Sequence, residues 1–524
     1  MTAAAVALDG LVAVPFVFSM LTLVLGRRRN GGAAIAVAVT GGLVALGWSI
    51  WAVVASGSGL RPSYVDVSWI AALDVRWHLG LDGMSGPLVL MTTLVVACCL
   101  VALVRNAPEC GGRAGLAALL LVVETGVLGS FLALDMVLFF MFFEVALIPM
   151  WFIIDGWGDP HDTAGRRRAA TRFLVFTVLG SAMMLVGFLL VHTATGTFDI
   201  VRIAASYHPH GALAIGAAVL VGLGLAVKTP LWPLHIWLPD AHAKAPTVGS
   251  VVLAAVLLKL GTYGLLRFWM PVTSPSWDLL VPIVAGLAVV GIVYAALACL
   301  VQTELKRLIA YSSVGHMGFV VLAVATFTVA GVQAAVYASI AHALITGLLF
   351  FVAGGIKDRY GTGELSRLTV LYGRVPRLAG IFAFAAIASL GLPGLAGFWG
   401  EMLTVRSALF GAPALPHTTY VVLAVIAAFG VILTTAYFLA LMRRMLQGAP
   451  AAVQPVNEDV ASIELATTEV EPASPVAGAV RPDVHAMEWV AWSPLIALTL
   501  VLGVAPGFLL TPVAAAARTF FGGL

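Results

Sequence analysis

Seven ionisable side chains lie inside long apolar stretches of this sequence, where charge is costly. They are Glu124, Glu144, Lys228, Lys259, His316, His342 and Glu401. An ionised side chain at the centre of a bilayer costs at least about 2.5–3.5 kcal/mol, so each one needs a partner, water or a function. Carboxylates, lysines and histidines all bind and release protons, and burial and neighbouring charges decide when they do so. A structural ion pair or a core position explains any one of them alone, but the whole set predicts proton transfer inside a membrane.

Hydroxyl side chains accompany the two histidines at helical spacing. Ser312 and Ser313 lie about one turn before His316, and further hydroxyls flank His342. Stripes of this kind can hold water. We therefore expect Ser312 and Ser313 to support a proton path beside His316. The alternative for either histidine taken alone is a structural position in the core, which is the more frequent role of a lone buried histidine.

Prolines interrupt two of the apolar stretches beside buried charges. Pro230 follows Lys228 by two residues, and Pro393 precedes Glu401. Each proline removes a backbone hydrogen bond and displaces the carbonyl four residues earlier, which for Pro230 belongs to Ala226. Irregular backbone at membrane depth is tolerated only inside protein or against water. We therefore expect two broken helices next to the charges, while the alternative is a pair of ordinary spans that are merely kinked.

The elements that must position these residues are membrane-spanning helices. Of the 524 residues, 61% are hydrophobic and 10% are charged, against about 25% charged in a soluble domain, so a soluble enzyme is excluded. The net charge of +3 is too small and dispersed for a nucleic-acid partner. Apolar runs of about 20 residues recur along the chain. They predict about fourteen spans, near residues 3–25, 33–55, 85–104, 115–133, 136–155, 173–194, 211–232, 247–268, 279–302, 309–328, 332–354, 378–410, 419–442 and 489–512.

These spans predict an all-α polytopic membrane protein with two five-helix repeats. Spans four to eight and nine to thirteen form two blocks, and the broken helices, seven and twelve, are the fourth members of each. An odd number of spans inverts the second block relative to the first. The predicted divisions are 1–113 (spans 1–3 with an outer hairpin near 59–84), 114–268 (first repeat), 277–446 (second repeat), 447–488 (an acidic, proline-rich disordered linker) and 489–524 (the last span).

The positions of lysine and arginine predict the orientation. Twenty of the 28 fall in alternate loops, six fall in the loops between them, and the other two are Lys228 and Lys259. Positively charged loops stay in the cytoplasm, so both termini are expected outside, on the periplasmic side of a bacterial-type inner membrane. The N-terminal stretch lacks a basic region before its apolar run, so we interpret it as the first span.

No metal or cofactor site is expected in this chain. Its four cysteines form no CxxC pair, so they predict neither a zinc site nor an iron–sulfur site.

Several segments resemble one family of membrane subunits. They are residues 143–150, 228–230, 233–242, 257–261, 305–318 and 397–401. The residues of these segments and their order along the chain are similar to those of the antiporter-like chain M subunits of proton-pumping NADH:quinone oxidoreductase, respiratory complex I. The glutamate in the twelfth span favours chain M, since related antiporter-like subunits carry a lysine there.

The resemblance implies a proton-translocating subunit that carries no redox centre. Glu144 and Lys228 would form the gating pair of the cytoplasmic half-channel. Lys259 and His316 would link the two halves with His342 alongside, and Glu401 would exchange protons with the outer side. FMN, iron–sulfur clusters and quinone would belong to partner subunits of the complex, and the partners of this chain would be the other membrane-arm subunits, related antiporter-like subunits among them, and the lipid bilayer.

Two other functions remain open at this point. A subunit of a multi-subunit Na⁺/H⁺ antiporter would share the glutamate, lysine and broken-helix plan. A membrane-bound transferase would need a carboxylate or metal cluster in a loop, for which Asp155, Asp159, His161 and Asp162 are the candidates.

Overall fold

The computed structural model describes residues 3–27, 31–56, 63–105, 110–274, 279–447 and 483–522. The predicted linker at 447–488 therefore lies largely outside the described residues. Thirteen of the described helices are long and apolar enough to cross a membrane. They are α1 (Ala3–Arg27), α2 (Gly31–Ala55), α3 (Ser85–Leu103), α4 (Arg113–Leu132), α5 (Met136–Trp157), α6 (Thr163–Thr195), α8 (Gly211–Lys228), the continuous Thr247–Val272 segment, α12 (Leu280–Leu300), α13 (Leu305–Val324), α14 (Val329–Tyr360), α18 (His417–Met442) with its extension η5 (Arg443–Gln447), and α19 (Ala486–Val504).

The predicted twelfth span is divided into two shorter helices. These are α16 (Pro376–Ser389) and α17 (Ala396–Leu409), with Pro393 in the connection. Gly391 and Gly394 within the connection have φ of 82° and 94°, a conformation that side chains with a Cβ rarely adopt. The divided span accounts for the difference between thirteen long helices and fourteen predicted spans, and the prediction of a polytopic all-helical membrane protein is confirmed.

The seventh span is broken as predicted, but the backbone hydrogen bonds at the break differ from the prediction. Helix α8 ends at Lys228, and the next helix, α9 (Leu238–Lys244), begins ten residues later. The prediction that Pro230 frees the Ala226 carbonyl is wrong, because the Leu231 N–H donates to that carbonyl at 2.9 Å. The chain turns after the proline, and the next available N–H takes the place of the missing one.

Two further irregularities were not predicted. The last span consists of α19 and α20 (Gly507–Gly522), which are separated at Pro506. The Thr247–Val272 segment changes its helical pitch along its length. It consists of α10 (Thr247–Val252), the π-helical turn η2 (Leu253–Leu257), α11 (Leu258–Gly264), the π-helical turn η3 (Leu265–Trp269) and the short 3₁₀ helix η4 (Met270–Val272).

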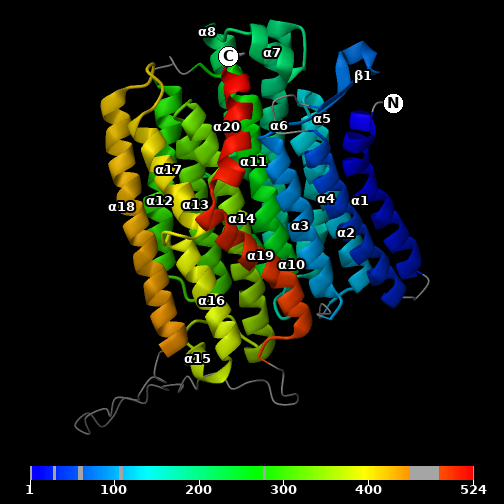
Figure 1. Cartoon of the computed structure of the whole chain (residues 1–524), viewed down its shortest axis with the longest axis vertical. Coiled ribbons are helices and arrows are strands. Elements are labelled where there is room, and N and C mark those ends of the chain that lie inside the picture. Colours follow the sequence, from blue (N-terminus) through cyan, green and yellow to red (C-terminus); the bar gives the residue numbers. More distant parts are fainter. Residues whose placement is uncertain are drawn as a thin grey trace.

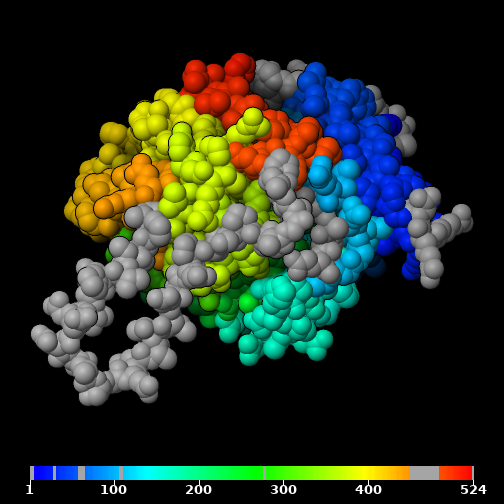
Figure 2. Space-filling model, turned by 90° about the horizontal axis from the view of Figure 1, so that it is seen from below, coloured from blue at the N-terminus to red at the C-terminus, as the bar shows by residue number. Residues whose placement is uncertain are grey.

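The long helices run side by side and define two ends of the molecule (Figure 1). One end carries the short helix α15 (Leu371–Arg374), and we call it the α15 end. The opposite end carries α7 (Ile200–Ser206), the start of α1 and the end of α20, so the first and last described helices reach the same side. Viewed from the α15 end, residues around α15 lie between α18 and α19 (Figure 2).

The predicted hairpin is confirmed as a two-stranded sheet; its assignment to the outer side stays a prediction. Strands β1 (Ser63–Ile70) and β2 (Val75–Leu81) pair antiparallel, with Ser63 opposite Leu81 and a register shift between Ser68 and Ile70. The connection contains η1 (Ala71–Leu73) and Asp74, which has φ of 52°. This hairpin lies at the end opposite α15 (Figure 1).

Burial separates central from peripheral helices. The apolar windows of α14 and of the Thr247–Val272 segment are buried throughout, whereas most of the corresponding windows of α1, α18 and α19 are not. Two of the ionisable residues, Lys259 and His342, are therefore carried by the two most central elements.

Candidate proton-transfer site

Lys259 and His342 meet at the centre of the molecule. Lys259 lies on α11, directly after the π-helical turn η2, and its Nζ donates to the Ala254 carbonyl of that turn at 2.8 Å. The same Nζ lies 2.6 Å from His342 Nδ1 on α14. π-Helical turns inside helices are frequent at functional sites, because they offset the backbone ladder and redirect a side chain. Here the turn supplies a carbonyl that holds the lysine against the histidine.

The contacts continue from His342 to Glu401. The ring centroids of His342 and His316 are 5.8 Å apart and the rings meet edge to face. His316 Nδ1 lies 3.5 Å from Glu401 Oε1. His316 Nε2 lies 3.1 Å from the Oγ of Ser389, which is the last residue of α16. We refer to Lys259, His342, His316 and Glu401 as the buried row. It crosses four helices, α11, α14, α13 and α17.

A small cavity lies beside the buried row. It has a volume of about 20 Å³, and its wall includes His316, His342, Thr346, Ser389 and Glu401. Neither oxygen of Glu401 has a hydrogen-bond partner among the described residues, and the same is true of His342 Nε2 and Thr346 Oγ1. A volume of this size holds about one water molecule, and buried polar atoms need such a partner. One water could therefore join the carboxylate to the histidines.

Glu144 and Lys228 are close but form no direct ion pair. Lys228 is buried, and its Nζ has no hydrogen-bond partner among the described residues. The ammonium instead lies 4.9 Å from the centroid of the Phe143 ring and 5.5 Å from that of Phe173. Glu144, next to Phe143 on α5, is the charged group that acts on Lys228 electrostatically. The lysine is thus held by aromatic faces while its carboxylate partner stays within reach, which leaves room for the pair to close and open.

The elements that carry the two lysines pack in direct contact. Gly261 on α11 lies so close to α8 that a Cβ there would be 2.3 Å from Thr229 Oγ1 and 2.7 Å from Thr229 N. Thr229 follows Lys228, and Gly261 lies two residues after Lys259. The broken end of α8 and the central helix α11 therefore approach through a position where only glycine fits.

Three of the predicted supporting residues do not join these groups. Glu124 on α4 is fully buried, neither of its oxygens has a hydrogen-bond partner, and no charged group acts on it among the described residues. The hydroxyls of Ser312 and Ser313 donate to the Ile309 carbonyl of their own helix, at 2.8 and 3.1 Å. Each hydroxyl oxygen can still accept a hydrogen bond, and Ser312 also contacts Tyr437, so a supporting role of these serines in a proton path stays a prediction.

Two buried histidines outside the predicted spans were missed by the sequence analysis. His242 lies on α9 and stacks on Phe350, and His235 lies in the broken segment with its ring against Tyr294. Both are buried. Their signal in the sequence was their position in the segment that follows the broken helix, which leads into α9, a helix packed against α6 and α13.

The acids after α5 are already engaged by basic residues. Lys357 and Lys244 lie 3.6 and 3.7 Å from Asp159, and Lys244 is 2.7 Å from Asp162. Burial opposes ionisation of Asp159, but these lysines and the His161 N–H outweigh it and hold the pKa of this carboxyl below its usual range. Asp155 lies 3.8 Å from Arg167. The arrangement offers no open carboxylate cluster for a transferase.

One group of side chains among the described residues has the spacing of metal ligands. Atoms of Asp66, His78 and Asp199 lie within 4.8 Å of one another near the hairpin. Arg76 binds Asp66 at 2.6 Å, and Asp199 accepts the Val201 N–H at the start of α7. The carboxylates therefore have structural roles already.

Comparisons with known proteins give one consistent picture. The family described as NADH:quinone oxidoreductase/Mrp antiporter, TM, matches residues 133–434. The NADH-quinone oxidoreductase subunit M of Rhodobacter capsulatus is 39% identical over 453 residues, which are 84% of this chain and 81% of that protein. A subunit of respiratory complex I from Thermus thermophilus with bound NADH superposes with a TM-score of 0.82 at 28% identity, covering 98% of this chain and all of that one. A chain of the Mrp complex from Dietzia sp. DQ12-45-1b also gives a TM-score of 0.82, but at 22% identity this likeness concerns the fold alone.

Proposed function

We infer the function from the family: the chain belongs to the NADH:quinone oxidoreductase/Mrp antiporter family and, within it, to the M-type, antiporter-like membrane subunits of NADH-quinone oxidoreductase. It is thus a subunit of a proton-translocating enzyme complex. The relatives at 39% identity are subunits of this oxidoreductase, which favours it over a separate Na⁺/H⁺ antiporter.

We propose that protons cross this chain through two sets of residues. Glu144 and Lys228 form the gate of the half-channel on the cytoplasmic side, and the buried row leads from Lys259 to Glu401. Because most lysines and arginines lie in loops at the α15 end, this end faces the cytoplasm and both termini face the outer side of the cell membrane. Glu401 then exchanges protons with the outer side.

The observation that carries the proposal is the continuity of the buried row. Its members are joined by contacts of 2.6 Å (Lys259 Nζ to His342 Nδ1) and 3.5 Å (His316 Nδ1 to Glu401 Oε1), with the two rings edge to face between them. An imidazole can accept a proton on one nitrogen and release one from the other, so two adjacent histidines can pass a proton from lysine to carboxylate without moving far. A structural ion pair would need neither histidine.

Reduction of quinone takes place in partner subunits. We assign FMN, iron–sulfur clusters and quinone to them, and to this chain only the response to that reaction. Its partners are the other membrane-arm subunits, including related antiporter-like chains, and the lipid bilayer.

The test uses the assembled complex in inverted membrane vesicles. Glu144→Gln, Lys228→Ala and Glu401→Gln should each abolish proton pumping and much of the coupled quinone reduction, while native gels show unchanged assembly. Glu364→Gln, which changes an exposed loop carboxylate, is the control. Normal pumping by a fully assembled Glu144→Gln or Lys228→Ala variant would remove the gate from these residues.

A further inference from the structure

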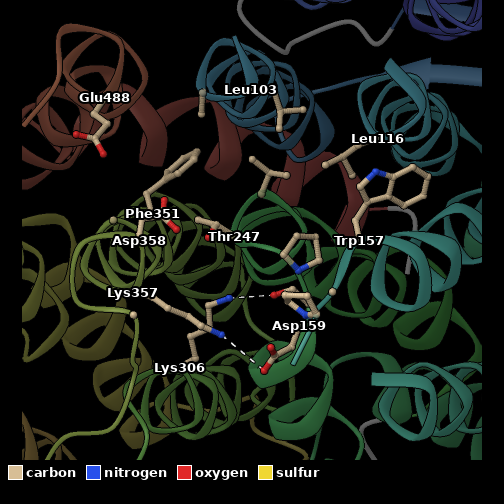
Figure 3. A pocket seen from close by; sticks show the side chains of 18 of the residues that line it. Leu103, Leu116, Trp157, Asp159, Thr247, Lys306, Phe351, Lys357, Asp358 and Glu488 are labelled. Atoms are coloured by element: carbon tan, nitrogen blue, oxygen red, sulfur yellow. Dashed lines mark hydrogen bonds and ion pairs between the residues drawn. The ribbon is translucent and has the colours of Figure 1, made fainter. Parts of the chain in front are cut away.

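A polar pocket opens at the α15 end of the molecule. Its volume is about 200 Å³, and its wall comes from segments that are far apart in the sequence, with Asp159, Thr247, Lys306, Phe351 and Lys357 among its residues (Figure 3). Lys306 is largely buried, and its Nζ donates to the Ala245 carbonyl at 2.9 Å. Lys357 faces Asp159 across the pocket at 3.6 Å. Neither Glu144 nor Lys228 lines this pocket.

His242 lies directly behind the wall of this pocket. It precedes Ala245, a wall residue, by one helical turn, and it stacks on Phe350, the neighbour of the wall residue Phe351, with ring centroids 4.4 Å apart and planes 9° from parallel. The ring is fully buried, yet neither nitrogen has a hydrogen-bond partner among the described residues. Stacking fixes the plane of the ring but satisfies neither nitrogen. Buried ring nitrogens without a protein partner need water.

His242 also contacts the helix that carries part of the buried row, because its stacking partner Phe350 lies on α14, eight residues after His342. The charges that act on it electrostatically are those of Lys306, in the pocket wall, and of Lys259, at the start of the row. It acts in turn on His342, the direct partner of Lys259. One buried imidazole is thus within electrostatic reach of both the pocket and the central lysine.

We propose that the pocket at the α15 end is a water-filled intake for protons and that His242 passes them from it to Lys259, by a route that does not pass through Glu144 and Lys228. This inference rests on the proposed function. In the step, a hydronium ion that enters the pocket from the cytoplasmic side gives its proton to one nitrogen of His242 and becomes water, and the proton on the other nitrogen goes through water to the neutral amine of Lys259. The imidazole ends neutral with its two nitrogens exchanged, and rotation of the ring or a return transfer restores it.

The two lysines on either side make this intake conditional. A positive charge on Lys259 disfavours a second positive charge on His242, and Lys306 adds to the effect. Transfer of the Lys259 proton to His342 therefore favours uptake of a proton by His242. The intake works in one direction for as long as the buried row removes protons from its other end.

The first experiment replaces the ring nitrogens and keeps the ring. His242→Phe preserves an aromatic ring against Phe350. His235→Phe is the matched control, since His235 is also buried but no charged group among the described residues acts on it. In inverted vesicles with equal amounts of assembled complex, we expect His242→Phe to slow proton uptake by roughly a hundredfold or more, the size of effect expected for loss of a proton-transfer group, and His235→Phe to stay near the unmodified rate. Equal rates for the two variants would overturn the proposal.

The second experiment blocks the pocket after the protein has folded. Thr247→Cys places a thiol in the pocket wall, and a bulky, reversible thiol reagent is added from the cytoplasmic side of assembled vesicles. We expect proton uptake to fall on modification and to recover when a reducing agent removes the adduct, whereas the unsubstituted chain, with its four native cysteines, shows neither change. Modification confirmed by mass spectrometry without loss of uptake would contradict the intake.

A third variant separates failure of this inference from failure of the proposed function. If Lys259→Met abolishes pumping while His242→Phe and modified Thr247→Cys pump normally, the buried row stands and the intake is wrong. If Lys259→Met also pumps normally, the proposed function itself fails.

Discussion

Replacing Gly391 by alanine should slow proton pumping much more than the same change at Gly394, although both substitutions strain the same connection between α16 and α17. The two glycines have φ of 82° and 94°. A left-handed backbone costs alanine roughly 1–2 kcal/mol at either position. The backbone penalty is therefore matched, and any difference between the variants comes from what the new methyl group contacts.

The surroundings of the two methyl groups differ at one residue. A Cβ at Gly391 would lie 2.6 Å from Glu401 Oε2, whereas a Cβ at Gly394 would have nothing within 4 Å. Ordinary van der Waals contact begins at 3.4 Å, so the carboxylate must move by about 0.8 Å. Its other oxygen is 3.5 Å from His316 Nδ1, and a displacement of this size disturbs that contact. Misplacement of a reacting group by about 1 Å can cost about a hundredfold in rate.

The assay is proton uptake into inverted vesicles, normalised to assembled complex on native gels. We expect Gly391→Ala to pump roughly ten to a hundred times more slowly than Gly394→Ala, with similar melting temperatures for the two complexes. If both variants pump equally, the position of the Glu401 carboxylate does not limit transfer. If only Gly391→Ala loses assembly, the effect is on folding and the reasoning is also refuted.

Two further predictions concern charges near the α15 end. The Glu488 carboxylate on α19 accepts two hydrogen bonds from Arg359 on α14, at 3.1 and 2.7 Å. Arg359→Met should destabilise the docking of α19 on α14 by about 3–5 kcal/mol, because Glu488 would remain buried without the arginine. Limited proteolysis should then cut the chain near α19 faster, and an unchanged cleavage rate would show that the pair contributes little. Asp159→Asn should lower the melting temperature of the complex at pH 7, because the ionised carboxylate of Asp159 is paired with Lys357 and Lys244. The lowered pKa of this carboxyl means that the pairing stabilises the fold above the ordinary aspartate pKa of about 3.9. The stabilisation is lost as the pH falls through the lower pKa of the folded protein. The difference between the variant and the parent chain should therefore shrink as the pH falls below about 4, and a difference that grew on acidification would contradict this assignment.

Much of the fold follows from one-dimensional features of the sequence. Span lengths depend on bilayer thickness, and the breaks at Pro230 and Pro393 depend on an N–H that proline lacks, so both are visible without knowledge of neighbouring helices. The hairpin turn at Leu73 and Asp74 is equally local. The twofold division into inverted repeats stays a prediction.

The candidate site could be predicted only as a set of residues. Charges in apolar runs identify Lys259, His316, His342 and Glu401, because their cost inside a membrane is independent of what surrounds them. Which of them touch depends on packing: Lys259 and His342 are 83 residues apart in the chain. The π-helical turn before Lys259, Leu253–Leu257, consists of apolar residues only and contains no proline or glycine that would indicate it in the sequence. Contacts of this kind become visible only when the helices are assembled.

His242 was missed for the opposite reason. Its short helix is too brief for a spanning run, and hydropathy therefore assigns it to a loop, yet the broken seventh span keeps α9 inside the protein. A proline that ends a helix at membrane depth has a consequence beyond the break itself. Several residues after it are buried, among them His235, Trp237 and His242, and polar side chains there should be weighed as interior ones.

The two lysines of the proposed path are connected by packing, not by a contact between their charges. Nζ of Lys259 is held by His342, while Nζ of Lys228 lies among phenylalanines, and Glu144 is the charge that acts on it. The elements that carry them nevertheless touch at Gly261, where even a methyl group would overlap the residue after Lys228. Close-packed interiors do not absorb such overlaps, so a shift of α11 that accompanies a change of charge on Lys259 must also shift the end of α8. Coupling between the gate and the buried row therefore needs no direct proton transfer between the lysines, because two rigid elements in contact are sufficient to transmit it.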